Sequence, residues 1–207
     1  MRRTQFALAV LLALVVSLAA GCGMGTPASN PSSSASGAAQ FSAYRNAEYL
    51  LSIAYPAGWT KTIATAASTA PKTGDRLLAA TFLDPKGAVA KSGMPVDGVM
   101  VEVFQLDRVV TPGKRYTSTA MRIMGGSLLP RLKLVQLADR PKDVTVHGDP
   151  GWSVAYRYSL QGHTMQALSV LVFKHRYAYW LTGHATAETW SGLWPQLRIS
   201  LGTFRVR

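Results

Sequence analysis

Cysteine is almost absent from this chain, which contains a single one, Cys22. A lone cysteine forms no internal disulfide, so the fold must rest on its hydrophobic core alone. Acidic residues are also scarce, because ten Asp and Glu stand against 22 Lys and Arg, a formal net charge of +12. This balance favours anionic partners such as lipid headgroups, wall polymers or an acidic protein face. The cations are scattered, however, and a merely solvated basic surface is the simpler interpretation.

Signatures of catalysis are also absent: there is no HExxH, cysteine-pair, P-loop or Gly-Xaa-Ser-Xaa-Gly motif. The histidines show no i, i+2 or i, i+4 spacing, so we expect them at turns or strand ends, although two could bind a metal across strands. They are His147, His163, His175 and His184. Three aspartates lie close together among basic residues and indicate a solvated loop: Asp139, Asp143 and Asp149. We therefore predict no enzyme activity, catalytic residue, metal or cofactor.

The chain has one long hydrophobic run, residues 6–20, which follows Arg2 and Arg3 and precedes a few small residues. A helix of about 15 residues reaches roughly 22 Å, short of the ~30 Å hydrocarbon core of a bilayer, so a permanent transmembrane helix is disfavoured. The order of positive, apolar and small-residue regions is typical of a secretory signal.

The end of this signal, Leu18-Ala19-Ala20-Gly21-Cys22, resembles the lipobox of bacterial lipoproteins. The resemblance implies that a diacylglyceryl group is attached to the cysteine thiol and that the signal is cut just before it. Alanine stands at the second position, where leucine is commoner. The alternative is an ordinary secreted protein whose cysteine falls there by chance. We expect residues 1–21 to be a lipoprotein signal peptide and Cys22 to anchor the protein on the extracytoplasmic, periplasmic or extracellular, face of the cell membrane.

Two further regions follow the signal. Residues 22–40 are rich in Ser, Ala, Gly and Pro and carry no charge, a composition that favours a flexible tether. Residues 41–207 have the length of one domain and can bury a substantial core. No internal repeat and no second linker divide them.

Within this domain, periodicity predicts strands first, then a helix, then more strands and a final helix. Thr111-Pro112 favours a helix start and Gly125-Gly126 its end. The expected strands are residues 49–55, 76–83, 98–106 and 133–137, followed by a meander of 152–160, 165–173 and 177–182. Apolar residues on both faces of 98–106 predict a sheet covered on both sides.

The last helix is predicted from tryptophan and leucine residues spaced on one helical face between 190 and 201. Pro195 conflicts with an uninterrupted helix and implies a kink, or a start near Ser191 with the proline in the first turn. The whole pattern predicts an α+β fold, with two helices and six to eight strands in a sandwich.

Two opening motifs carry a resemblance to a known family. Asn46-Ala47-Glu48-Tyr49, then Ile53-Ala54-Tyr55-Pro56-Ala57-Gly58-Trp59, are similar to the opening of PsbP-like domains. These include the extrinsic photosystem II subunit P and bacterial relatives such as DcrB-like and LpqN-like lipoproteins. The order of later motifs also matches, over nearly all of residues 41–207. The resemblance implies an α/β/α sandwich around a mainly antiparallel sheet, and a binding or assembly-assisting role. A metal-contacting histidine of plant members would fall near His163, but no acidic partner accompanies it here, and the site is not carried over.

The five tryptophans divide into two groups. Trp180, Trp190 and Trp194 are expected in the core, pinning the last helix to the sheet. Trp59 and Trp152 each follow a proline- and glycine-containing turn, and either line a ligand groove or cap the sheet edge.

Three functions remain open on the sequence alone. The first is a non-catalytic lipoprotein that binds or helps assemble a membrane-surface partner, an anionic surface or a membrane protein complex, and not nucleic acid. The second is a lipoprotein that binds a small ligand, and the third is a hydrolase with an unrecognised site.

Overall fold

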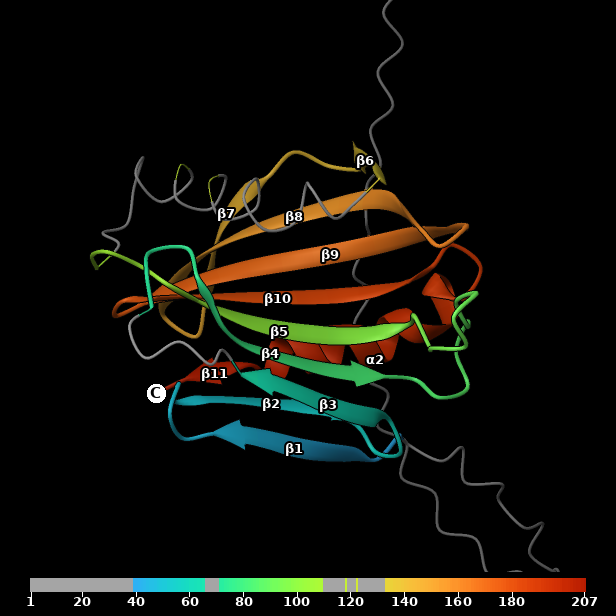
Figure 1. The fold of residues 1–207 in the computed structure, drawn as a ribbon, viewed down its shortest axis with the longest axis horizontal. Helices are drawn as coiled ribbons and strands as arrows, with labels where there is room; N and C mark the ends of the chain where they lie inside the picture. The colour runs from blue at the N-terminus through green and yellow to red at the C-terminus, as the bar shows by residue number, and fades with distance from the viewer. Residues whose placement is uncertain (1–38, 66–70, 110–117, 119–121, 123–132) are drawn as a thin grey trace, which may run out of the picture. The chain divides into compact units, whose positions relative to one another are not determined.

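The computed structural model describes residues 39–65, 71–109, 118, 122 and 133–207 (Figure 1). The predicted signal peptide, Cys22 and nearly all of the tether lie outside these described residues, as does most of the helix predicted after Thr111. The described part contains two antiparallel sheets and one long helix.

The larger sheet has eight strands in the order β3-β4-β5-β10-β9-β8-β6, with β7 also paired to β8. Its strands are β3 (Thr60–Thr65), β4 (Arg76–Leu83), β5 (Gly98–Gln105), β6 (Lys133–Leu137), β7 (Lys142–Val146), β8 (Asp149–Leu160), β9 (His163–Lys174) and β10 (Tyr177–Thr186). The smaller sheet, in the order β1-β2-β11, contains β1 (Phe41–Asn46), β2 (Leu51–Pro56) and β11 (Arg205–Val206). This confirms the predicted α+β class with its antiparallel sheet.

The meander β8-β9-β10 forms as the sequence predicts, with each strand antiparallel to the next. Gln161 and Gly162 both have positive φ, 49° and 93°, which suits the tight turn between β8 and β9. Strand β5 is buried on both faces along most of its length, which confirms that the sheet is covered on two sides.

The helix α2 (Trp190–Thr203) lies behind β4, β5 and β10 in the view of Figure 1. It approaches the sheet closely because Gly183 has no side chain: a Cβ there would lie 3.3 Å from Leu201 and 3.5 Å from Leu197. On its other side Thr203 Oγ1 accepts a hydrogen bond of 3.0 Å from the Ala54 amide of β2. The helix thus joins the two sheets. Among the described residues, no helix combines the length and hydrophobicity needed to cross a bilayer.

The helix begins at Trp190, one residue before the predicted start near Ser191, which makes Pro195 its sixth residue. One detail of the predicted core is wrong. Trp180 is buried, but it packs with Phe104 on the face of the sheet that α2 does not cover. Trp190 and Trp194 do pack against the α2-side core, with their rings stacked 5.2 Å apart. The error over Trp180 follows from strand alternation, which sends neighbouring residues of β10 to opposite faces.

Candidate functional site

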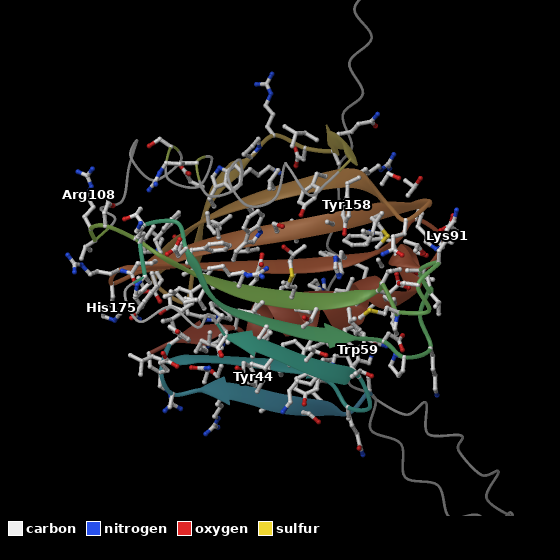
Figure 2. All side chains as sticks on the ribbon, viewed as in Figure 1. Tyr44, Trp59, Lys91, Arg108, Tyr158 and His175 are labelled. Atoms are coloured by element: carbon white, nitrogen blue, oxygen red, sulfur yellow. The ribbon has the colours of Figure 1, made fainter. Side chains whose placement is uncertain are left out.

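Cations gather at one end of the domain, where turns and chain segments far apart in sequence meet. The β9–β10 turn, the end of β1 and the last strand all reach this end (Figure 1). Figure 2 shows His175 here and Lys91 with Trp59 at the opposite end, where β1 begins. We call the first the basic end and the second the tether end. The basic end comprises Arg45, Lys174, His175, Arg176, Arg205 and Arg207.

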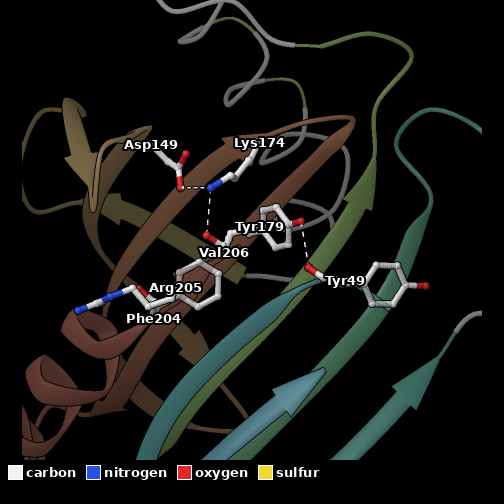
Figure 3. A network of polar contacts seen from close by, with 7 residues as sticks. All are labelled: Tyr49, Asp149, Lys174, Tyr179, Phe204, Arg205 and Val206. Carbon is white, nitrogen blue, oxygen red and sulfur yellow. Dashed lines mark hydrogen bonds and ion pairs between the residues drawn. The ribbon is translucent and has the colours of Figure 1, made fainter. Parts of the chain in front are cut away.

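A polar network fastens the basic end to the sheet (Figure 3). Lys174 Nζ pairs with Asp149 at 3.2 Å and donates a 3.0 Å hydrogen bond to the Val206 carbonyl, which holds β11 against β9. The Tyr179 hydroxyl donates to the Tyr49 carbonyl at 3.1 Å, and its ring contacts Phe204. Burial is the main cause that raises the pKa of the Tyr179 hydroxyl, so it stays a protonated donor. These contacts join β11 and the β1–β2 turn to the larger sheet.

The arginines of the basic end have no carboxylate partners among the described residues. Arg205 donates to the carbonyls of Gly202 and Phe204, both at 2.9 Å, and contacts His147. Arg176 donates to the Asp107 carbonyl at 3.3 Å. Since carbonyl groups orient these guanidinium groups without neutralising them, their positive charge remains available to an anionic partner.

Comparison with solved structures identifies proteins whose fold is similar to that of this chain. Cyanobacterial PsbP (CyanoP) from Synechocystis sp. PCC 6803 superposes with a TM-score of 0.56, at 15% identity over 86% of this chain and 98% of that one. The chain has the PsbP-like fold. LpqN of Mycobacterium tuberculosis, described as involved in cell envelope biogenesis, matches at TM-score 0.46 and 13% identity over 80% of this chain and 89% of its own. The Ran-binding protein Mog1p of Saccharomyces cerevisiae matches at TM-score 0.44 and 11% identity, covering 82% and 96%. No family model and no curated sequence matches.

The two tryptophans predicted to line a groove lie apart in the PsbP-like domain. Trp59 belongs to the α2-side core and borders a hollow of about 290 Å³ with Gln40, Lys86 and Gln196 at the tether end. Trp152 is 2% exposed and belongs to the core of the other face. The structure therefore does not bring them into one site, and a ligand groove at Trp59 stays a prediction.

A buried histidine, His184, and a buried aspartate, Asp97, lie near each other inside the domain, which sequence spacing does not reveal. The Tyr158 hydroxyl lies 3.0 Å from His184 Nδ1, while Nε2 is enclosed and has no partner among the described residues. Burial lowers the pKa of His184 to about 4, although nearby Asp97 acts in the opposite direction. Asp97 is fully buried and accepts hydrogen bonds from the amides of Ala88 and Thr186. Its hydrogen bonds thus join the loop before β5 to the end of β10.

Beside this pair, a row of hydroxyl groups crosses the same face. Ser169 Oγ lies 3.1 Å from the Tyr156 hydroxyl and 2.7 Å from Thr182 Oγ1. Burial raises the pKa of Tyr156 to about 12, against the opposing effect of these hydrogen bonds. The hydroxyl groups of the row hydrogen-bond to one another, and His184 Nε2 is enclosed. We therefore assign these buried groups a role in the fold. Among the described residues, no cluster of three or more His, Cys, Asp or Glu could hold a metal ion.

Proposed function

We propose that this protein is a lipid-anchored, non-catalytic binding lipoprotein of the cell membrane. In this proposal acyl chains on Cys22 fix it to the extracytoplasmic face, residues 22–40 form a tether, and the PsbP-like domain binds or helps assemble a membrane-surface protein partner. The observation that supports it best is the basic end, where the arginines have no carboxylate partner in the part of the chain that the structure describes.

The charge of the basic end favours an anionic partner. Guanidinium groups that carbonyl groups orient without neutralising can pair with the carboxylates of an acidic protein face or with another anionic surface.

One observation favours a second function, the binding of a small ligand. The hollow of about 290 Å³ beside Trp59 offers an indole edge, two amide side chains and Lys86. Its volume is at the lower limit of small-molecule pockets. A test is a thermal-shift screen of the protein and of its Trp59→Phe variant, in which a ligand of this site would raise only the wild-type melting temperature.

Crosslinking in intact cells, followed by mass spectrometry, tests the proposed partner. The wild-type chain is compared with an Arg176→Gln, Arg207→Gln variant and with a Lys86→Gln, Lys91→Gln control that removes the same charge at the tether end. We expect a reproducible extracytoplasmic partner that the first variant loses and the control retains. A wild-type chain that captures no reproducible partner contradicts the proposal.

The anchor is tested separately by fractionation. A Cys22→Ala variant should leave the membrane fraction for the soluble extracytoplasmic fraction, because it has no thiol to acylate. Unchanged retention in the membrane would refute lipidation at this residue.

A further inference from the structure

A small hollow opens at the basic end between the β1–β2 turn and the last residue of the chain. Its volume is about 270 Å³, and its lining is mainly apolar, with Leu50, Leu51 and Ala47 contributing hydrocarbon. Two cations, Arg45 and Arg207, line it as well. The site therefore combines an apolar interior with positive charge. None of its lining residues belongs to the network of Figure 3.

Leu50 has an unusual conformation for its type. Its φ is 53°, in the left-handed region that leucine rarely adopts, and the residue is 47% exposed. A leucine in this position adopts an unfavourable backbone conformation and buries little of its surface in return. Strained residues of this kind persist only where their surroundings impose the conformation, and they concentrate at functional sites.

Hydrogen bonds on three sides impose that conformation here. The Tyr49 amide donates to Asn46 Oδ1 at 2.9 Å, and the Tyr49 carbonyl accepts from the Tyr179 hydroxyl. The Arg207 amide donates to the Leu50 carbonyl at 2.9 Å. The turn thus holds an exposed leucine at the mouth of an apolar hollow.

The positive charge of the lining arginines indicates which kind of ligand the hollow would bind. Arg45 and Arg207 have no carboxylate partner among the described residues, and further cations of the basic end lie beyond them. A guanidinium group next to an apolar cavity favours a ligand that carries a carboxylate beside a hydrocarbon group.

We propose that this hollow binds an acidic–apolar segment of a partner protein, whose Leu, Ile or Phe side chain fills it while an adjacent Asp or Glu pairs with Arg45 and Arg207. The inference deepens the proposed function and rests on it. A volume of about 270 Å³ lies below the usual range of small-molecule pockets, about 300–1,000 Å³, and suits one large side chain better than an acyl chain.

A randomised seven-residue peptide library displayed on phage tests the proposal with the full chain purified in detergent. We expect the wild-type protein to enrich Asp or Glu next to Leu, Ile or Phe. A synthetic peptide from the enriched set should bind Arg45→Gln at least three-fold more weakly, with a smaller loss of affinity on adding salt. The matched charge control is Lys91→Gln at the tether end, which should bind as the wild type does.

Leu50→Asn separates a binding role from a structural one. Asparagine tolerates a positive φ better than leucine, so this variant should melt at the same temperature as the wild type or higher. It should nevertheless bind the peptide at least ten-fold more weakly, because the apolar contact is lost. The matched control is Gln161→Asn, which makes the same kind of change at φ 49° in the β8–β9 turn and should keep full affinity.

Three outcomes overturn the inference. One is a library that enriches no acidic–apolar class, and another is a Leu50→Asn variant that binds the selected peptide with wild-type affinity. The third is selective binding of vesicles with phosphatidylglycerol, but not of peptides, through the same residues. If Leu50→Asn still captures the crosslinked partner of the wild type, this inference fails alone. If the wild type captures none, the proposed function fails.

Discussion

The two faces of the eight-stranded sheet both bury a hydrophobic core, but only one of them also buries a row of hydroxyl groups and a histidine. The α2-side face is hydrocarbon and aromatic, and Phe82 lies there with its ring stacked 4.4 Å from Tyr55 of the smaller sheet. The opposite face contains the hydroxyl row at Ser169 and the enclosed pair of Tyr158 and His184. Both faces should respond to lost volume, and the second should respond to lost hydrogen bonds and to pH as well.

The difference has a structural reason. Hydrophobic contact is not directional, so the α2-side face can join elements that approach at different angles, the helix and the smaller sheet. Hydrogen bonds between hydroxyl groups on β8, β9 and β10 demand one alignment of these strands. A slip of one residue would break the row and reverse the side chains of the strand, so the polar face helps to set the register.

The largest effect is expected from Phe82→Ala. Phe82 is fully buried, and truncating a buried phenylalanine costs about 3–5 kcal/mol of unfolding free energy through lost burial and a residual cavity. Urea unfolding at pH 7 and pH 5 should give the same loss, because no titrating group is removed. Ile63→Ala on the adjacent strand β3, with its side chain 39% exposed, should change stability by less than about 0.5 kcal/mol. A loss of unfolding free energy that doubles at pH 5 would contradict a purely hydrophobic role for the α2-side face.

The next effect concerns pH and His184. The pKa of His184 falls from 6.5 to about 4 on folding. Below pH 6.5 the histidine therefore binds a proton more readily in the unfolded chain than in the native state. The stability from the neutral ring is complete above about pH 6.5 and is lost between pH 6.5 and 4, by roughly 3 kcal/mol at 1.36 kcal/mol per pH unit. His184→Asn keeps an acceptor for Tyr158 and should remove this slope, as measured by urea unfolding across that range.

The control for that slope is His175→Asn, since His175 is exposed and already has a positive φ of 56°. Its pH profile should match the wild type, because both proteins contain the buried His184 to which the pH dependence is assigned, as well as the same carboxylates. Identical slopes for His184→Asn and wild type would show that the histidine is not held neutral.

Ser169→Ala should have a smaller effect. It leaves the buried hydroxyls of Tyr156 and Thr182 without the group that links them, a loss of about 1–2 kcal/mol. Ser153→Ala, at a half-buried position of β8, should cost less than about 0.5 kcal/mol. Thermal unfolding of both variants checks this, and equal melting temperatures would mean that the hydroxyl row contributes nothing.

The sequence predicted the elements that leave a clear apolar pattern. Strands β8 and β9 bury alternate residues over much of their length, helix α2 shows a helical period, and the buried strands β5 and β10 are apolar runs. Strand β3 was missed because all of its residues are exposed, which leaves no apolar period to detect. Strand β7 begins with Lys142 and Asp143, and its charges resembled a solvated loop. Strand β11 has only two residues, too few for any pattern.

The candidate site was less predictable than the fold. Arg45 lies more than a hundred residues before Arg176 and Arg205, and the three look scattered in the sequence, but strand ends bring them to one end of the domain. No residue type marks Leu50 as left-handed, because that conformation is imposed by the Tyr179 and Arg207 hydrogen bonds. Sequence patterns report local preferences, whereas this site depends on contacts between distant segments.

The smallest expected effect concerns helix α2, which lies outside the sheet, and it tests whether the two faces of the sheet are independent. Gly192 lies near the start of α2, and a Cβ added there meets nothing within 4 Å. Gly192→Ala should therefore stabilise the domain by about 0.5–1 kcal/mol, because alanine loses less conformational freedom than glycine in a helix. The gain should be equal at pH 7 and pH 5 and should add to the effect of His184→Asn, which acts on the other face. Non-additive melting temperatures in the double variant would mean that the two faces are coupled through β10, and that their separation is less complete than the contacts indicate.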